Sequence, residues 1–312
     1  MLMPTKHSLG ILLISLSGCA GSKPYSSPGS VKYRLLNPLL AEDSSVEFTE
    51  LRPFGYKVRA LAEESKKAGR ATHVSVYFRD LENGPLFGVS MEEKFSPASL
   101  LKVPLMMAAL KEAEADPALL DRRVRNEQRE LARAGIDAFA LAPGAEYSVD
   151  SLLRAMITAS SNDAAILLRS VISAEALDAV FRDFGMIIPG VRALDDSMTV
   201  RGYASFFRIL YNAAYLDKEM SGKALEYLTL SEFKRGLVAG LPPGTVAAHK
   251  FGERSFIDSK TKQLHDCGIV YHPARPYVLC VMTRGDDFDA LSAVIKDVSA
   301  LIYEEVSTQQ KR

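Results

Sequence analysis

The sequence predicts an α+β fold in which both ends of the chain build one sheet around an all-helical insertion. Segments of strand character occur at residues 72–89 and again at residues 246–283. Between them the chain is mostly of helical character, from residue 109 to about residue 237, and an amphipathic segment over residues 286–306 closes it as a helix. Two strand-forming regions separated by helices favour an α/β sandwich plus a helical lobe.

Length and composition set the class of protein. The chain has 312 residues, which suits two closely packed lobes better than one small domain. Hydrophobic residues make up 47% of it, enough for an extended core. Lys and Arg together number 38, as do Asp and Glu, so no basic surface for nucleic acid is expected.

The first 19 residues have the pattern of an export signal. A short basic head precedes an apolar run at residues 9–16, which is far too short to span a bilayer. The run leads into Ser17-Gly18-Cys19, which resembles the end of a bacterial lipobox and implies cleavage before Cys19 and a lipid on its thiol. The alternative is an ordinary export signal with an incidental cysteine. We expect an exported lipoprotein of the cell envelope on the periplasmic side of a membrane, and by analogy Ala20 favours the outer membrane.

The remaining elements follow in order. Residues 20–47 are rich in Ser, Pro and Gly at their start and are expected to form a tether or arm. Apolar residues at helical spacing predict a surface helix over residues 51–68. The β-branched and aromatic residues of 72–81 predict a strand that turns at residues 82–85 into a second strand. The later elements are predicted as helices over residues 148–157, 164–168 and 203–216 and strands over residues 246–251, 267–271 and 277–283.

Two cysteines remain after the predicted lipidation site. Cys267 and Cys280 lie at similar distances from a predicted turn at residues 271–277, so they could face each other across a hairpin, and export would permit a disulfide. Paired strand positions do not automatically have the Cβ geometry that a disulfide needs. We expect a buried reduced pair and leave the disulfide open.

A serine and a lysine three residues apart, Ser99 and Lys102, open an apolar stretch with helical character. Positions i and i+3 of a helix share a face, and a helix N-terminus favours negative charge. A serine is a poor nucleophile until a base takes its proton, and a desolvated lysine can be that base. The alternative is a helix cap followed by a surface lysine, because this spacing alone is common by chance.

Two further motifs occur in order after this pair: Ser160-Ser161-Asn162 and Lys250-Phe251-Gly252. Taken singly, the first reads as a helix N-cap and the second as a solvated strand end. Together with Ser99-Leu100-Leu101-Lys102 they resemble the signature of the penicillin-recognising serine hydrolases, the class A β-lactamases and transpeptidase-like penicillin-binding proteins. Their signature is Ser-x-x-Lys, then Ser-x-Asn, then Lys-(Ser/Thr)-Gly.

The resemblance covers roughly residues 51–306 and implies an antiparallel sheet flanked by helices. One catalytic domain is expected over residues 48–308, with a sheet lobe (about 48–98 and 238–308) and a helical lobe (about 99–237) that hold the site between them.

The resemblance also implies a role for each residue. Ser99 attacks an amide carbonyl and becomes acylated, and Lys102 takes its proton, provided that a nearby cation such as Lys250 favours the neutral amine. Ser160 relays a proton to the leaving nitrogen, and Asn162 orients the lysine and the substrate amide. His249, beside the third motif, is expected to be structural.

Substrate binding is expected at the third motif. The backbone N–H groups of the nucleophile and of Glu253, the residue after Gly252, would form an oxyanion hole. Phe251 departs from the family pattern, in which a hydroxyl at this position helps to hold the substrate carboxylate. Arg254, or Arg284 in its place, could hold that carboxylate with a bidentate guanidinium.

A second departure concerns deacylation. Class A β-lactamases carry a glutamate on a loop between the second and third motifs, where it activates the water. The matching stretch, residues 174–199, has no Glu-x-x-x-Asn, and its nearest carboxylates are Asp183, Asp195 and Asp196. Asp195 and Asp196 are expected to lead into the next helix at Thr199. Without a positioned base, an acyl-enzyme turns over slowly.

We therefore predict a serine hydrolase that is acylated by a β-lactam or a related cell-wall amide. The alternatives are a D,D-peptidase or penicillin-binding protein with slow deacylation, and a non-catalytic, lipid-anchored cell-wall-binding protein. Expected partners are the substrate and the membrane that holds the lipid anchor. No metal or organic cofactor is expected, because no cluster has ligand spacing and His265-Asp266-Cys267 lies within one strand start.

Overall fold

The computed structural model describes residues 51–82, 84, 86–127, 141–185, 196–256 and 259–309. The predicted signal, Cys19, the tether and Asp195 lie outside the described residues. In the part of the chain that is described, no helix has both the length and the apolar character needed to cross a membrane.

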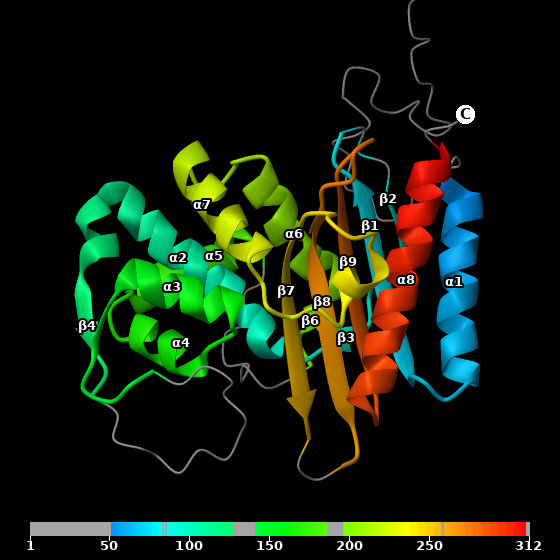
Figure 1. The fold of residues 1–312 in the computed structure, drawn as a ribbon, viewed down its shortest axis with the longest axis horizontal. Helices are drawn as coiled ribbons and strands as arrows, with labels where there is room; N and C mark the ends of the chain where they lie inside the picture. The colour runs from blue at the N-terminus through cyan, green and yellow to red at the C-terminus, as the bar shows by residue number, and fades with distance from the viewer. Residues whose placement is uncertain are drawn as a thin grey trace, which may run out of the picture. The chain divides into compact units, whose positions relative to one another are not determined.

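One five-stranded sheet organises the structure, and all of its neighbouring strands are antiparallel, as predicted (Figure 1). Its order is β2-β1-β9-β8-β7, so strands from the two ends of the chain pair in the middle and β7 lies at an edge. The strands are β1 (His73–Asp80), β2 (Leu86–Val89), β7 (Ala247–Ser255), β8 (Lys262–Val270) and β9 (Tyr277–Gly285).

Strand β8 begins five residues before its predicted start at Cys267. The added residues include Gln263, His265 and Asp266, all of them fully buried. Polar residues are mostly exposed in proteins, so a search for apolar residues did not include this part of the strand. Their burial requires polar partners. Those of Gln263 and His265 include Ser96, close to the candidate nucleophile, whereas Asp266 contacts Leu237 and His249.

Two long helices, α1 (Arg52–Lys67) and α8 (Phe288–Gln309), cover one face of the sheet (Figure 1). Helix α1 forms because Phe54, Val58 and Ala62 recur on one stripe, and all three are buried. Phe54 packs edge-on against Phe78 of β1 and Phe87 of β2, with ring centroids 5.1 and 4.6 Å away. This layer is a hydrophobic core of its own.

The other face carries the helical insertion (Figure 1). Its helices are α2 (Lys102–Ala115), α3 (Val149–Thr158), α4 (Asn162–Arg169), α5 (Ala174–Asp183), α6 (Val200–Tyr211) and α7 (Lys218–Thr229). Side chains of Ser148, Ser161, Ser173, Thr199 and Asp217 cap the helices α3 to α7. Helix α2 lies at the centre, with every residue from Lys102 to Leu110 buried.

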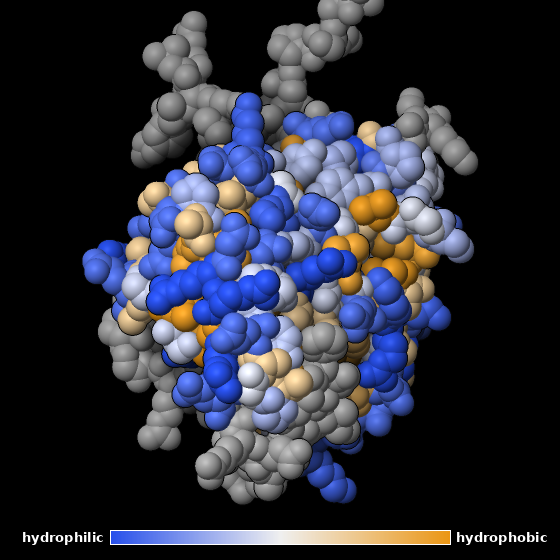
Figure 2. Space-filling model, turned by 60° about the vertical axis from the view of Figure 1, so that its left-hand side comes forward, coloured by the Kyte–Doolittle hydropathy of each residue, from blue (hydrophilic) through white to orange (hydrophobic). Residues whose placement is uncertain are grey.

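Short elements connect these layers. Strand β3 (Lys94–Phe95) pairs with β6 (Met198–Thr199), and β4 (Arg123–Arg125) pairs with β5 (Glu146–Ser148). In the part of the chain that the structure describes, the 3-10 turns are η3 (Ala98–Leu101), η4 (Pro117–Asp121) and η5 (Leu237–Gly240). One face of the molecule is mainly hydrophilic with small apolar patches between the charged side chains (Figure 2).

Cys267 and Cys280 are joined by a disulfide, so the expected reduced pair is wrong. The two residues lie directly opposite each other in the β8–β9 ladder, with their Cα atoms 3.9 Å apart. The register therefore brings both sulfurs to the same side of the sheet, within the core shared with the helices.

Candidate active site

The candidate nucleophile lies on a continuous helical segment. Ser99 is in the 3-10 turn η3, and Lys102 is the first residue of α2, so the two stand three residues apart on helical backbone. Ala98, immediately before Ser99, has a φ of +48°. A non-glycine residue in this region costs of order 1–3 kcal/mol, so the surrounding contacts must hold the turn in place.

Three sheet side chains hold the entry to this turn at Ser96, which is fully buried. The Ser96 N–H donates to Gln263 Oε1 at 2.9 Å, and Arg254 Nη1 donates to Ser96 Oγ at 2.8 Å. His265 Nε2 lies 3.0 Å from the Ser96 carbonyl oxygen. We call Gln263, His265 and Arg254 the Ser96 clamp. It fixes the nucleophile segment to strands β7 and β8.

The Ser96 clamp sets the protonation of His265. A carbonyl oxygen only accepts hydrogen bonds, so Nε2 must carry the proton. Burial lowers the pKa of His265 to about 4, and hydrogen bonds to the backbone oppose the shift. The ring is therefore neutral near pH 7, and it acts as a donor within the core.

A tyrosine that the sequence analysis missed holds the same turn from the helical side. Tyr203 of α6 is fully buried, and its hydroxyl donates to the Leu100 carbonyl oxygen at 3.0 Å. Burial raises the pKa of Tyr203 well above its usual value. In the sequence, Tyr203 is simply a tyrosine in an amphipathic helix. Such a pattern does not distinguish a tyrosine that only packs in the core from one that also donates a hydrogen bond.

Lys102, Ser160, Asn162 and Lys250 come together beside the nucleophile turn, and we call them the amine cluster. Lys102 Nζ donates to the Ser160 carbonyl oxygen at 2.5 Å, to Ser160 Oγ at 3.1 Å and to Asn162 Oδ1 at 2.7 Å. Lys250 Nζ donates to the same Ser160 Oγ at 2.9 Å. Because each amine donates to one lone pair of Ser160 Oγ, the hydroxyl group can still donate its own proton to a third group.

Lys250 is fully buried, although lysine is among the most exposed residue types. Burial lowers its pKa well below the usual value, and the positive charge of Lys102 lowers it further. The carboxylates of Asp266 and Glu253 act in the opposite direction. Because the amines of Lys102 and Lys250 lie against one hydroxyl, protonation of both at once is disfavoured. An amine that is neutral can accept a proton.

The second motif contains both a helix cap and a member of the amine cluster. Ser161 Oγ accepts the Ala164 N–H at 3.2 Å and caps α4, as the single-motif interpretation predicts. Ser160, just before it, has a φ of +57° and faces the two lysines instead. The two interpretations apply to adjacent residues.

Gly252 lies where strand β7 touches the nucleophile turn. A Cβ on Gly252 would stand 2.9 Å from the Pro97 carbonyl oxygen and 3.1 Å from the Leu100 backbone nitrogen. These are backbone atoms, which cannot give way as a flexible side chain can. The third motif therefore needs glycine for close approach.

The predicted oxyanion donors are set by the same geometry. The Tyr271 N–H, at the end of β8, donates to the Val246 carbonyl oxygen, just before β7, so the backbone of Val246 faces β8. Along an antiparallel strand, the backbone groups of successive residues face alternate sides. The N–H of Glu253 therefore points away from β8, towards the open edge. The N–H of Ser99 belongs to the first turn of a helical segment, which lacks intrahelical acceptors.

The two arginines considered for a substrate carboxylate already have partners. Arg254 belongs to the Ser96 clamp, and its guanidinium lies over the Phe256 ring. Arg284 donates to Glu93 Oε1 at 2.8 Å and to Asp196 Oδ2 at 2.7 Å. The predicted role of Arg254 in substrate binding stays a prediction.

The described loop carboxylates also have partners away from the amine cluster. Asp196 accepts from Gln263 Nε2 at 2.9 Å as well as from Arg284. Asp183 is hydrogen-bonded to Tyr215, and the pKa of Tyr215 is raised by burial first and by the charge of Asp183 next. Within the described residues, neither carboxylate is placed as the base that deacylation needs.

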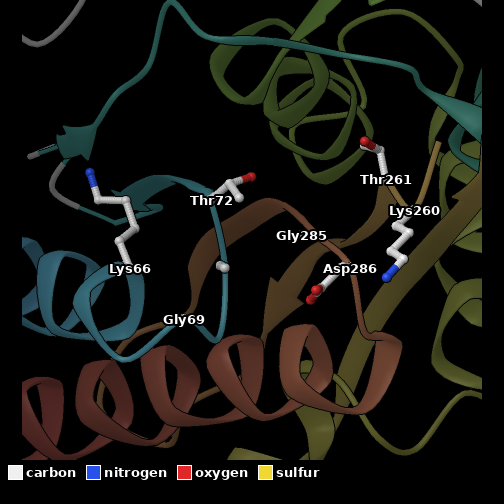
Figure 3. Close-up of a pocket in the computed structure, with 8 residues that line it drawn as sticks. Lys66, Gly69, Thr72, Lys260, Thr261, Gly285 and Asp286 are labelled. Atoms are coloured by element: carbon white, nitrogen blue, oxygen red, sulfur yellow. The ribbon is translucent and has the colours of Figure 1, made fainter.

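A cavity of about 470 Å³ lies elsewhere, where the end of α1 meets the ends of the sheet strands (Figure 3). Its lining residues are Lys66, Gly69, Ala71, Thr72, Lys260, Thr261, Gly285 and Asp286. None of them belongs to the amine cluster or the Ser96 clamp, so the cavity is separate from the candidate active site.

Comparisons with known proteins give a family and a fold for the chain. A family model described as the beta-lactamase enzyme family matches residues 56–306. The solved structure of PBP-A has a TM-score of 0.68 and 21% identity, and the match covers 80% of this chain and 96% of that one. A mutant of PBP-A solved as an acyl-enzyme complex with penicillin G has a TM-score of 0.69 and 22% identity, over 83% and 97%. A beta-lactamase from Sphaerobacter thermophilus has a TM-score of 0.69 and 21% identity, over 80% and 97%.

Proposed function

Since the chain belongs to the beta-lactamase enzyme family of serine hydrolases, we propose that it opens a β-lactam or a related cell-wall amide through an ester on Ser99. The observation that carries the proposal is the amine cluster. It places two lysines, one of them fully buried, on the hydroxyl of Ser160 beside the nucleophile turn.

The proposed chemistry has two stages, acylation of Ser99 and hydrolysis of the ester. Ser99 Oγ forms a bond to the substrate carbonyl carbon while its proton passes to Lys102, in the form of the cluster in which Lys250 carries the positive charge and the Lys102 amine is neutral. The carbonyl oxygen, now negative, accepts from the N–H groups of Ser99 and Glu253. The C–N bond then breaks as the Ser160 hydroxyl gives its proton to the leaving nitrogen, and the protonated lysine restores that proton. Water later cleaves the ester and frees the acid.

We propose further that deacylation is slow compared with acylation. Asp183 and Asp196 are the described candidates for a water-activating base, and both have partners elsewhere. Among the described residues, attack of water on the ester then has no general base, whose help typically contributes about 100- to 10,000-fold.

Intact-protein mass spectrometry after brief exposure to benzylpenicillin tests this function. We expect an adduct of the drug's full mass that maps to Ser99 and lasts for minutes, and no adduct on the Ser99→Ala variant. Fast consumption of a chromogenic cephalosporin without a lasting adduct would contradict slow deacylation. Neither adduct nor consumption would contradict the proposed function itself.

The proposed place of action is the cell envelope, with Cys19 as the lipid anchor. The motif Ser17-Gly18-Cys19 supports the anchor, and the disulfide between Cys267 and Cys280 fits an oxidising compartment. In bacteria expressing the full chain, the wild type should fractionate with membranes and incorporate labelled palmitate. Cys19→Ser should release the protein and abolish the label, and unchanged membrane association would contradict the anchor.

A further inference from the structure

The proposed acylation needs the positive charge of the amine cluster on Lys250, but the contacts within the cluster favour Lys102. Lys102 Nζ donates to the carbonyl oxygen and Oγ of Ser160 and to Asn162 Oδ1. Lys250 Nζ donates to Ser160 Oγ and to the Phe251 carbonyl oxygen, and its side chain is the more buried of the two. Hydrogen bonds to a charged group stabilise the charged form, and burial destabilises it. Another group must therefore favour the charge on Lys250.

A buried carboxylate, Asp266, lies beside Lys250 in the sheet. It stands opposite Phe251 in the β7–β8 ladder, and Phe251 is the residue after Lys250. The Asp266 side chain is fully buried and shares a face of β8 with Leu264, which packs in the core with α8. Lys250 stands opposite Cys267, whose side chain packs in the core with α2. The carboxylate therefore acts on Lys250 through space, across one layer of sheet backbone.

The hydrogen bonds of Asp266 are those of an ionised carboxylate. The Leu237 N–H donates to Oδ2 at 2.9 Å, and His249 Nδ1 lies 2.8 Å from Oδ1. Among the described residues, His249 Nε2 has no hydrogen-bond partner, so the ring fits best with a single proton on Nδ1, where it donates to Asp266. A neutral histidine solvates the charge of Asp266 but does not cancel it. A buried charge is stabilised by an opposite charge nearby, and protonated Lys250 supplies one.

Four groups act on the protonation of Lys250. Burial lowers its pKa most and the positive charge of Lys102 lowers it next, whereas the carboxylates of Asp266 and Glu253 raise it. Glu253 is exposed, so solvent and salt screen its charge, but a fully buried carboxylate is screened much less. Within about 10 Å, and at an effective dielectric constant of about 20, one such charge changes a protonation equilibrium by about tenfold.

Tyr203 of α6 also lies within the field of Asp266. Burial and then the charge of Asp266 raise the pKa of Tyr203 well above its usual value. The phenol is therefore neutral and adds no charge that would offset the effect of Asp266 on Lys250.

Building on the proposed acylation of Ser99, we propose that Asp266 is a positioning residue for this reaction. Its buried carboxylate holds the positive charge of the amine cluster on Lys250. The Lys102 amine is then neutral and takes the proton of Ser99. Asp266 acts through Lys250 and touches no substrate.

Removal of the Asp266 charge with little change of shape tests this inference. Asp266→Asn keeps an oxygen for the Leu237 N–H, and its amide donates to His249 Nδ1 once the ring proton is on Nε2. On the full chain, the rate constant for adduct formation on Ser99 by benzylpenicillin is measured between about pH 6 and about pH 9.5. Intact-protein mass spectrometry follows the adduct, and circular dichroism checks the fold.

We expect the pH profile of Asp266→Asn to move to higher pH by about one unit. Without the carboxylate, part of the charge passes to Lys102, so the rate on the acid side of the profile falls about tenfold. The rate recovers at high pH, where both amines are neutral. An unchanged profile in the folded variant, or a loss of rate by one factor at every pH, would overturn the inference.

Asp80→Asn is the matched control. Asp80 is also a buried carboxylate of the sheet, and it forms an ion pair with Arg275 at 3.1 Å. Its strand, β1, is separated from β7 by two other strands. The substitution should lower stability and leave the pH profile of acylation as in the wild type. An equal shift in this control would overturn the assignment to Asp266.

The wild-type protein gives a second test that does not depend on the folding of any Asp266 variant. An NMR titration follows the side-chain Cε signals of the lysines, with Lys102→Ala used to assign the signal of Lys102. We expect Lys102 to lose its proton at a lower pH than Lys250. The reverse order would overturn the inference.

These results separate the two proposals. An adduct on Ser99 whose pH profile does not respond to Asp266→Asn defeats this inference alone. No adduct on the wild-type protein at any pH defeats the proposed function, and this inference with it.

Discussion

The two walls of the candidate site differ in what they contain. The helical wall, with Lys102, Ser160 and Asn162, is a set of proton donors and acceptors in mutual contact. The sheet wall joins one buried lysine, Lys250, to an aromatic ring, and packs a glycine against the nucleophile turn. Under the proposed mechanism, the difference means that the helical wall would supply proton transfer, while the sheet wall would hold the nucleophile turn in position.

The largest effect is expected at the helical wall. Lys102→Ala removes the proposed base, so acylation of Ser99 by benzylpenicillin should fall by about 100- to 10,000-fold. Stopped-flow or mass-spectrometric rates would measure it, with circular dichroism to check the fold. Acylation at the wild-type rate would assign the base to another group and erase the difference between the walls.

The two adjacent serines sharpen the comparison. Ser160→Ala removes the hydroxyl between the two amines and should lower acylation about 100-fold, the low end of general acid–base effects. Ser161→Ala removes only the cap of α4 and should cost about 0.5–2 kcal/mol of unfolding free energy with little change in acylation. Rates and denaturant melts of both variants separate chemistry from capping. Equal effects on both measurements would mean that the two serines share one structural role.

At the sheet wall, Gly252→Ala should misplace the nucleophile turn. The new Cβ meets backbone atoms of Pro97 and Leu100, and a shift below 1 Å at reacting groups can cost about tenfold to a hundredfold in rate. Gly222→Ala in α7 is the matched control, since nothing lies within 4 Å of its Cβ, and it should stabilise the helix slightly. Unchanged acylation in Gly252→Ala would show that the contact of β7 with the turn does not position Ser99.

The last prediction concerns the Ser96 clamp and the pH dependence of stability. The pKa of His265 is lowered to about 4 in the folded protein, against about 6.5 unfolded. Its contribution to stability is therefore present above pH 6.5 and is lost as the pH falls from there towards 4. Glutamine in the variant His265→Gln keeps a donor for the Ser96 carbonyl but does not titrate. Over this pH range the unfolding free energy of the variant should therefore fall by about 3 kcal/mol less than that of the wild type.

Denaturant melts of the wild type and of this variant at pH 7 and at pH 4.5 measure the difference. His272, whose pKa is also lowered by burial, is common to both proteins and cancels. The same pH dependence in both proteins would show that His265 does not cause the loss of stability at low pH.

Much of the fold followed from local pattern. The strands at residues 72–89 and the helix α6, predicted over residues 203–216 and found at Val200–Tyr211, were predicted because buried segments repeat with the period of their structure. The spacing of Ser99 and Lys102 likewise needs only a helix to bring the pair to one face. Strand β8 was cut short in the prediction, because Gln263 and His265 look like surface residues until their partner Ser96 is known.

The sequence by itself determined the order of the elements, the three motifs and the departure at Phe251, all of which are properties of neighbouring residues. Only the tertiary structure decided which distant residues meet. It joined Cys267 to Cys280, placed Lys250 on Ser160, and gave Arg254 to Ser96. The physical reason is that strand register and the burial of polar groups depend on the whole packed core, where each donor takes the acceptor that the fold brings to it.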